Sequence, residues 1–116
     1  MKSLKYQHKN LASGRWEEFC FLEQLVNIGG EVERAIRWRN RDNKEYAKLA
    51  FFRSLELIDL TLASNLTPSQ RKEVARVREA WVDFFAYDNI YNTTAESWQK
   101  YFMQFLIKLR VGSERH

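Results

Sequence analysis

The sequence is poor in the residues that build turns, cross-links and metal sites. Its 116 residues include one proline, four glycines, one cysteine and two histidines. So few turn residues argue against a β-sandwich or barrel, in which many short strands are joined by glycine- and proline-rich turns. The single cysteine, Cys20, has no partner for an internal disulfide, which fits a reducing compartment. We therefore expect a cytoplasmic protein.

Long apolar runs are also missing. No stretch approaches the roughly 18 consecutive apolar residues that indicate a membrane span, and no secretory signal is evident. We therefore expect a soluble protein with no membrane segment. A composition of 45% apolar and 29% charged residues is ordinary for a folded chain. The length predicts one domain over residues 1–116.

Acidic residues are absent from the first 15 positions, which hold Lys2, Lys5, Lys9 and Arg15. The net charge of +4 therefore lies in this segment, and residues 16–116 carry 15 basic and 15 acidic side chains. We expect residues 1–12 to form a basic arm and residues 113–116 to fray. The balanced charge of the remainder gives no global positive field.

What the sequence does contain is helical periodicity in four stretches. Within residues 15–39, Phe21, Leu25, Ile28 and Val32 recur at intervals of four, three and four, which predicts one face of a helix that points to a core. Further helices are predicted over about residues 43–63, 69–87 and 94–112. Four amphipathic helices with short connections predict an all-α fold, an antiparallel up-down four-helix bundle.

Helix starts are marked by capping boxes, in which two side chains three positions apart each bond the other residue's backbone. Pro68 at a first helical position strengthens one of these signals. Ser13 or Gly14 is expected to cap the first helix, and Gly112 to end the fourth. The predicted boxes are Asp42 with Glu45, Thr67 with Gln70 and Thr93 with Glu96.

Two adjacent glycines, Gly29 and Gly30, fall in the middle of the first predicted helix. Each costs about 1 kcal/mol of helix stability relative to alanine. Gly29 lies on the apolar side, where a missing side chain lets a second helix approach, whereas Gly30 lies towards the polar side. A kink is the alternative explanation, and we favour close packing.

The polar side of this helix has two interpretations. In the first, Gln24, Asn27, Glu31 and Arg34 form a solvated face with one weak ion pair. In the second, they form a polar patch that a partner or a second copy covers. Large aromatic residues on a polar face favour the second interpretation, because exposed aromatic area often marks an interface. Those aromatics are Trp16 and Trp38.

The second predicted helix is apolar almost all round, with Leu49, Phe52 and Leu60 opposite its main apolar face. A helix of this kind is buried, so we expect the bundle to cover one face and an oligomer partner the other. The sequence therefore predicts a homo-oligomer. Arg53 and Glu56 lie in apolar surroundings and must be paired, either with each other or with the first helix.

A metal site is not predicted, although helical bundles often hold two metal ions between Glu and Glu-x-x-His side chains. The two histidines, His8 and His116, lie in the terminal segments. The candidate carboxylates have arginines three residues away that compete for them. We therefore predict a salt-bridge network without metal or cofactor. Its members are the carboxylates Glu31, Glu56, Glu79 and Asp83 and the arginines Arg34, Arg53 and Arg76.

Catalytic residues are not predicted either. Cys20 stands beside Phe19 and Phe21 without a nearby histidine, and we expect it to be a packing residue. Arg110 and His116, separated by five residues, resemble the arginine–histidine signature of HEPN-family ribonucleases, which are small dimeric helical bundles. That resemblance implies a ribonuclease as the least favoured alternative.

Nucleic-acid binding is a further alternative, because basic and aromatic residues occur close together in the sequence. Phosphate neutralisation and base stacking need these residue types. The balanced charge of residues 16–116 favours instead a solvated basic rim. The basic residues concerned are Lys2, Lys5, Lys9 and Arg15 near the N-terminus, and Arg34, Arg37, Arg39, Arg41 and Lys44 around the end of the first predicted helix.

Several motifs carry a resemblance across nearly the whole chain. They are RW-x2-F-x4-EQ-x2-NIG-x-EV-x-RAI-x-WRN from Arg15 to Asn40, RSLELIDLT, RVREAWVDFF and WQKYF. Together they resemble a group of small bacterial proteins of undefined activity. The resemblance implies a bacterial source and brings no activity, cofactor or catalytic residue. The leading hypothesis is a non-catalytic, self-associating interaction or accessory protein.

Overall fold

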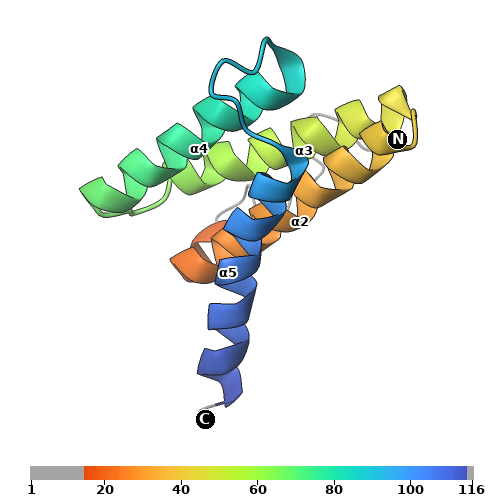
Figure 1. Ribbon diagram of the computed structural model, residues 1–116. Helices are drawn as coiled ribbons and strands as arrows, with labels where there is room; N and C mark the ends of the chain where they lie inside the picture. The colour runs from red at the N-terminus through yellow and green to blue at the C-terminus, as the bar shows by residue number, and fades with distance from the viewer. Residues whose placement is uncertain (1–14, 115–116) are drawn as a thin grey trace, which may run out of the picture.

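The computed structural model describes residues 15–114, and this part of the chain contains helices and no strand. A short 3₁₀ turn, η2 (Arg15–Glu18), comes before four α-helices. The prediction of an all-α fold with four helices is confirmed. The helices are α2 (Phe21–Asn40), α3 (Lys44–Leu62), α4 (Pro68–Ala86) and α5 (Ala95–Glu114) (Figure 1).

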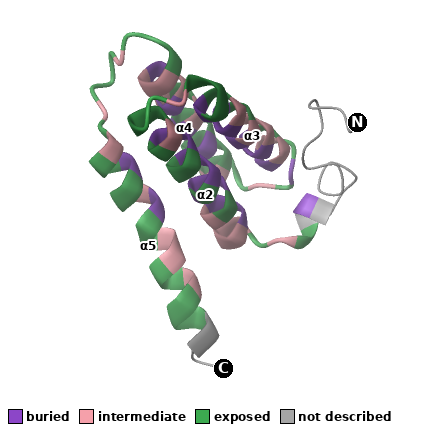
Figure 2. Cartoon of the chain, turned by 90° about the vertical axis from the view of Figure 1, so that its right-hand side faces the viewer, coloured by how far each residue is buried: buried purple, intermediate pink, exposed green. Residues whose placement is uncertain are grey.

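The helices pack in the order α4, α3, α2, α5. Helices α2 and α3 lie side by side and form the most extensive contact, α4 packs on α3, and α5 packs on α2 (Figure 1). Both overall views show that the C-terminal half of α5 extends beyond the other three helices (Figures 1 and 2). This packing is compatible with a bundle. Among the described side chains of the C-terminal half of α5 none is fully buried, although Phe105 packs against the core.

Aromatic side chains fill the core between these helices. Phe51 of α3 stacks on Phe85 of α4 with ring centroids 4.4 Å apart, and Trp81 of α4 meets Trp98 of α5 edge-on at 5.6 Å. Every buried indole N–H has a hydroxyl acceptor, as a buried donor requires. The pairs are Trp16 with Thr61 at 2.8 Å, Trp81 with Ser54 at 2.8 Å and Trp98 with Thr93 at 3.0 Å.

The first helix begins later than the sequence predicts. Residues 15–18 form the 3₁₀ turn, and the cap is Cys20 in place of Ser13 or Gly14. The Cys20 thiol accepts the Glu23 N–H at 3.5 Å, and the Glu23 carboxylate accepts the Cys20 N–H at 2.9 Å. Cysteine is not a preferred capping residue, so the signal was missed. Cys20 is also exposed, so its predicted packing role is wrong.

The other predicted helix ends are right at one site and displaced at three. Thr67, Pro68 and Gln70 form the predicted capping box. Asp42, the predicted cap of α3, adopts a left-handed backbone conformation with φ 58°. Helix α3 is therefore capped by Asn43. The capping box of α5 is formed by Thr94 and Ser97 in place of Thr93 and Glu96. Helix α5 does not end at Gly112 but continues to Glu114.

The packing prediction for Gly29 is confirmed and separates it from its neighbour. A Cβ on Gly29 would lie 2.7 Å from the Cβ of Phe102, whereas a Cβ on Gly30 would meet no atom within 4 Å. Both residues lie within a continuous helix from Phe21 to Asn40. Close approach of α5 therefore explains Gly29 and leaves Gly30 unexplained.

Helix α3 is buried on one face only. Ala50, Ser54 and Ile58 are fully covered, whereas Phe52 on the opposite face is 51% exposed. Leu49 and Leu60, also expected to be buried by a partner, are half-buried.

Candidate functional site

Glu31 is a buried carboxylate that joins two helices. It is 6% exposed, and its Oε2 accepts a hydrogen bond from Arg53 Nε of α3 at 2.8 Å. Its Oε1 accepts from Arg34 Nη1, one turn further along α2. A buried charge needs such partners. Glu31 is therefore no part of a solvated face, and Arg53 reaches the first helix.

The rest of the polar row is divided between core and solvent. Gln24 is buried, and its Nε2 donates to the carbonyl oxygen of Trp16 at 3.0 Å, which ties η2 to α2. Asn27 is exposed and donates to the carbonyl of Glu23 at 2.8 Å. The row therefore contains both structural and surface residues, which the sequence pattern did not separate.

Glu79 and Asp83 form hydrogen bonds with the connection between α4 and α5, and not with Glu31, Arg34 or Arg53. Asp83 Oδ1 accepts the N–H of Ile90, and Oδ2 accepts that of Tyr91, both at 3.0 Å. The Tyr91 hydroxyl donates to Glu79 Oε1 at 2.6 Å, and this hydrogen bond raises the pKa of Tyr91. Arg76 is exposed on α4. The predicted network therefore occurs as separate groups.

The two tryptophans predicted to flank a partner surface differ in burial. Trp16 is 2% exposed and donates to Thr61, so the expectation that it faces outward is wrong. Trp38 is half-buried and packs edge-on against Tyr46 with centroids 4.9 Å apart. Of the two tryptophans, only Trp38 therefore contributes exposed aromatic surface, and the guanidinium of Arg41 lies 5.6 Å from its ring centroid.

Two arginines in the last turn of α2 have partners within the chain. Arg37 pairs with Glu33 at 3.3 Å. Arg39 donates to the carbonyls of Phe84 and Phe85 at 3.4 and 3.3 Å and lies over both rings. These contacts reduce the support for a phosphate-binding cluster. Lys2, Lys5 and Lys9 lie outside the described residues, as do His116 and the side chain of Arg15.

An apolar row on α5 is the main exposed feature that the sequence analysis overlooked. Met103, Ile107 and Val111, each four residues from the next, are 51%, 54% and 41% exposed. Ile107 and Val111 lie in the C-terminal half of α5, which extends beyond the other helices, and Met103 comes just before that half. Their spacing was visible in the sequence, but apolar spacing alone does not show which of these positions a neighbouring helix covers.

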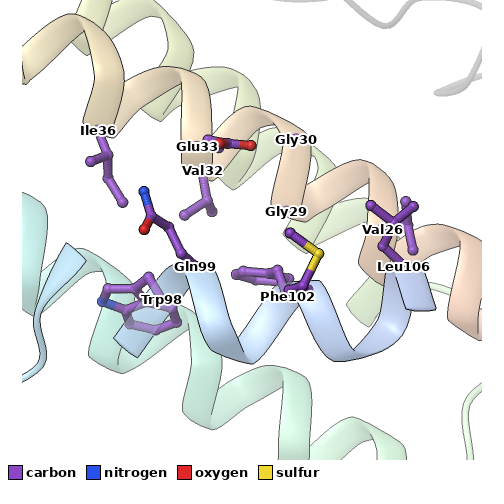
Figure 3. A pocket seen from close by; sticks show the side chains of 11 residues that line it. Val26, Gly29, Gly30, Val32, Glu33, Ile36, Trp98, Gln99, Phe102 and Leu106 are labelled. Atoms are coloured by element: carbon purple, nitrogen blue, oxygen red, sulfur yellow. The ribbon is translucent and has the colours of Figure 1, made fainter. Parts of the chain in front are cut away.

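A groove of about 390 Å³ lies between α2 and α5, beside this row (Figure 3). Its floor is apolar, and Glu33 stands at its edge on α2. Gly30 lines it at a point where its own chain leaves free space. The groove is also lined by Val26 of α2 and by Gln99, Met103 and Leu106 of α5.

Within residues 15–114, no three His, Cys, Asp or Glu side chains lie together as metal ligands would. None of the helices in this part of the chain has the length and apolarity required to cross a bilayer. Arg110 is exposed on α5, and its pairing with His116 lies outside the described residues.

Comparison of the chain with protein-family models, with curated proteins and with solved structures gave no match. The candidate site therefore has to be interpreted from its own residues, and the strongest feature is the groove together with the exposed row of α5.

Proposed function

We propose that this chain is a non-catalytic interaction protein that self-associates, an up-down helical bundle in which a second copy covers the extended half of α5. The observation that carries the proposal is the exposed row Met103, Ile107 and Val111. Large apolar side chains in a continuous row, next to an apolar groove, are typical of a protein interface.

Burial of these three side chains alone does not provide enough free energy for a stable dimer. Full burial of one such side chain contributes about 1.5–3 kcal/mol, and these three are already about half covered. Association costs an estimated ~4–15 kcal/mol in lost translational and rotational freedom. The interface must therefore extend beyond the row, and the α2–α5 groove is the adjoining apolar surface.

We also propose the cytoplasm as the compartment, because Cys20 is the single cysteine and is exposed. An exposed thiol without a disulfide partner is best maintained where thiols stay reduced. A bacterial source remains what the sequence resemblance implies.

The test is size-exclusion chromatography with light scattering on the wild-type chain and two variants. Ile107→Glu places a charge in the exposed row of α5, and Phe52→Glu is the matched control, because Phe52 is exposed to a similar extent on α3. We expect a dimer or larger species for wild type and Phe52→Glu, and a monomer for Ile107→Glu. Circular dichroism checks that all three remain helical.

Two results would overturn the proposal. A wild-type chain that is monomeric at micromolar concentration removes self-association. A dimer that dissociates in Phe52→Glu but not in Ile107→Glu moves the interface to α3. Copurified nucleic acid, detected by absorbance, together with a monomer would favour the nucleic-acid-binding alternative.

A further inference from the structure

We infer that the groove between α2 and α5 receives α5 of a second copy, antiparallel to the first α5, with a two-fold axis at Met103. This inference rests on the proposed self-association and adds the partner's identity, orientation and register. Three independent observations carry it: the spacing of residues on α5, the distribution of charge along that spacing, and the exposed Gly30.

The spacing defines one side of α5. Glu96, Gln99, Met103, Leu106 and Arg110 follow at intervals of three, four, three and four, the pattern that helices use when they pack at a small angle. Gln99, Met103 and Leu106 line the groove. This stripe adjoins the side that packs on α2 with the buried Trp98 and Phe102, and those two side chains line the same groove.

The charges on this stripe are self-complementary only in one orientation. Glu96 is near its start and Arg110 is near its end, both are exposed, and each is seven residues from Met103. In an antiparallel pair centred on Met103, Glu96 of one copy faces Arg110 of the other, twice by symmetry. A parallel pair would instead place like charges together, which is unfavourable. Charge therefore favours a second copy in the antiparallel register.

Gly30 supplies the steric argument. It is exposed in the middle of α2, it lines the groove, and a Cβ there would meet nothing in its own chain. A glycine at such a site disfavours the helix relative to alanine. Its neighbour Gly29 is explained by Phe102. If a helix of a second copy approaches α2 closely at Gly30, on the open side of the groove, the missing side chain of Gly30 makes room for it, as that of Gly29 does for Phe102.

The groove and the stripe then form one continuous surface. In the antiparallel register, Ile107 of the second copy lies opposite Gln99, at the part of α5 that borders the groove near Trp98 and Ile36 (Figure 3). Exposed apolar side chains of each copy are thus placed over the apolar floor of the other. The interface extends over α2 as well as α5, as the energetic argument for self-association requires.

Disulfide trapping tests the two-fold axis directly. In a Cys20→Ser background, Met103→Cys places one thiol at the axis, where two copies bring their thiols together. Gln104→Cys is the matched control, because Gln104 is the next residue, is also exposed and lies on another side of the helix from the stripe. Under mild oxidation we expect a covalent dimer for Met103→Cys and at least a tenfold lower yield for Gln104→Cys.

Charge reversal tests the register. Glu96→Arg and Arg110→Glu, made singly, should each weaken the dimer by roughly threefold to tenfold, because two exposed ion pairs are replaced by like charges. The double variant restores opposite charges and should return to within about twofold of wild type. Gly30→Ala should weaken the dimer while it raises the melting temperature of the monomer.

The outcomes separate this inference from the proposal on which it rests. A wild-type dimer that shows no preference for cross-linking at position 103 and no rescue in the double charge variant overturns the antiparallel groove arrangement and leaves self-association intact. A wild-type monomer overturns both. Selective trapping at position 103 with charge rescue supports both.

Discussion

Gly29 and Phe102 lie so close together that α2 and α5 meet almost backbone to backbone. A Cβ on Gly29 would be 2.7 Å from the Phe102 Cβ, a separation that real Cβ atoms do not tolerate. The absence of one methyl group therefore fixes the crossing point of the two helices. Because the crossing lies in the N-terminal half of α5, the C-terminal half extends away from the body of the molecule (Figure 1).

Gly29→Ala should destabilise the fold, and Gly30→Ala should not. The new methyl group at position 29 collides with the Phe102 Cβ, which is close to the backbone and cannot rotate away. Overpacking of this kind costs about 1–3 kcal/mol, against a gain in helix propensity of up to about 1 kcal/mol. Urea unfolding of monomeric protein, for example in an Ile107→Glu background, measures both changes. Equal effects of the two substitutions would contradict the close approach.

Arg53→Met should lower stability more than Arg34→Met. Both side chains bond Glu31, but Arg53 comes from α3 with a side chain 27% exposed, whereas Arg34 lies on the same helix as Glu31 and is 59% exposed. Loss of Arg53 leaves a buried carboxylate with a solvent-exposed partner only. We expect a loss of about 1–3 kcal/mol for Arg53→Met and under about 1 kcal/mol for Arg34→Met. Thermal unfolding gives the comparison, and a larger effect at Arg34 would be inconsistent with it.

Ser54→Ala should cost about 1–3 kcal/mol, because it leaves the buried indole N–H of Trp81 without an acceptor. The Ser54 hydroxyl accepts that N–H at 2.8 Å and itself donates to the Phe51 carbonyl at 2.5 Å. A double-mutant cycle with Trp81→Phe isolates this hydrogen bond. The two losses should sum to more than the loss in the double variant, and strict additivity would show that the bond contributes nothing.

Tyr101 should make stability fall at alkaline pH. Burial and a hydrogen bond from its hydroxyl to Glu73 raise its pKa above the ordinary value of 10.0. Because the folded-state pKa is the higher one, this stabilisation is complete below about pH 10 and is lost as the pH rises beyond it, when the unfolded chain ionises first.

Urea unfolding at about pH 9 and about pH 11, on either side of the ordinary tyrosine pKa, measures this effect. Tyr101→Phe should lose less stability between the two values than wild type. Tyr46→Phe is the control, because Tyr46 is 49% exposed, and it should follow wild type. If Tyr101→Phe also follows wild type, Tyr101 ionises alike in the folded and unfolded states.

The sequence predicted the helices well because their determinants are local. Apolar spacing located all four helices, and the run Thr67-Pro68-Ser69-Gln70 gave the correct start of α4, since a capping box depends on residues three positions apart. The ends of α2, α3 and α5 were displaced where an unusual or adjacent side chain capped the helix, as Cys20 and Asn43 do.

The candidate site was only partly predictable. The sequence predicted a helical protein that self-associates, and the self-association stays a prediction. It also placed Gly30 towards the polar side of its helix, where close packing within the chain does not explain a glycine. It did not identify the exposed row on α5, because Met103 and Ile107 satisfy the same apolar pattern whether they face a core or solvent. It also placed Trp16 outside and Glu31 on a polar face, since helical spacing alone does not show which neighbour covers a side chain.

The sequence by itself thus determined the helical class and the approximate position of each helix, because hydrophobic period and capping act over a few residues. Only the tertiary structure decided that Trp16 is buried against Thr61, that Glu31 pairs with Arg53, and that the C-terminal half of α5 extends beyond the other helices. These relationships depend on how closely α5 approaches α2 at Gly29 and on which helices meet, and both are set by contacts between residues far apart in the chain.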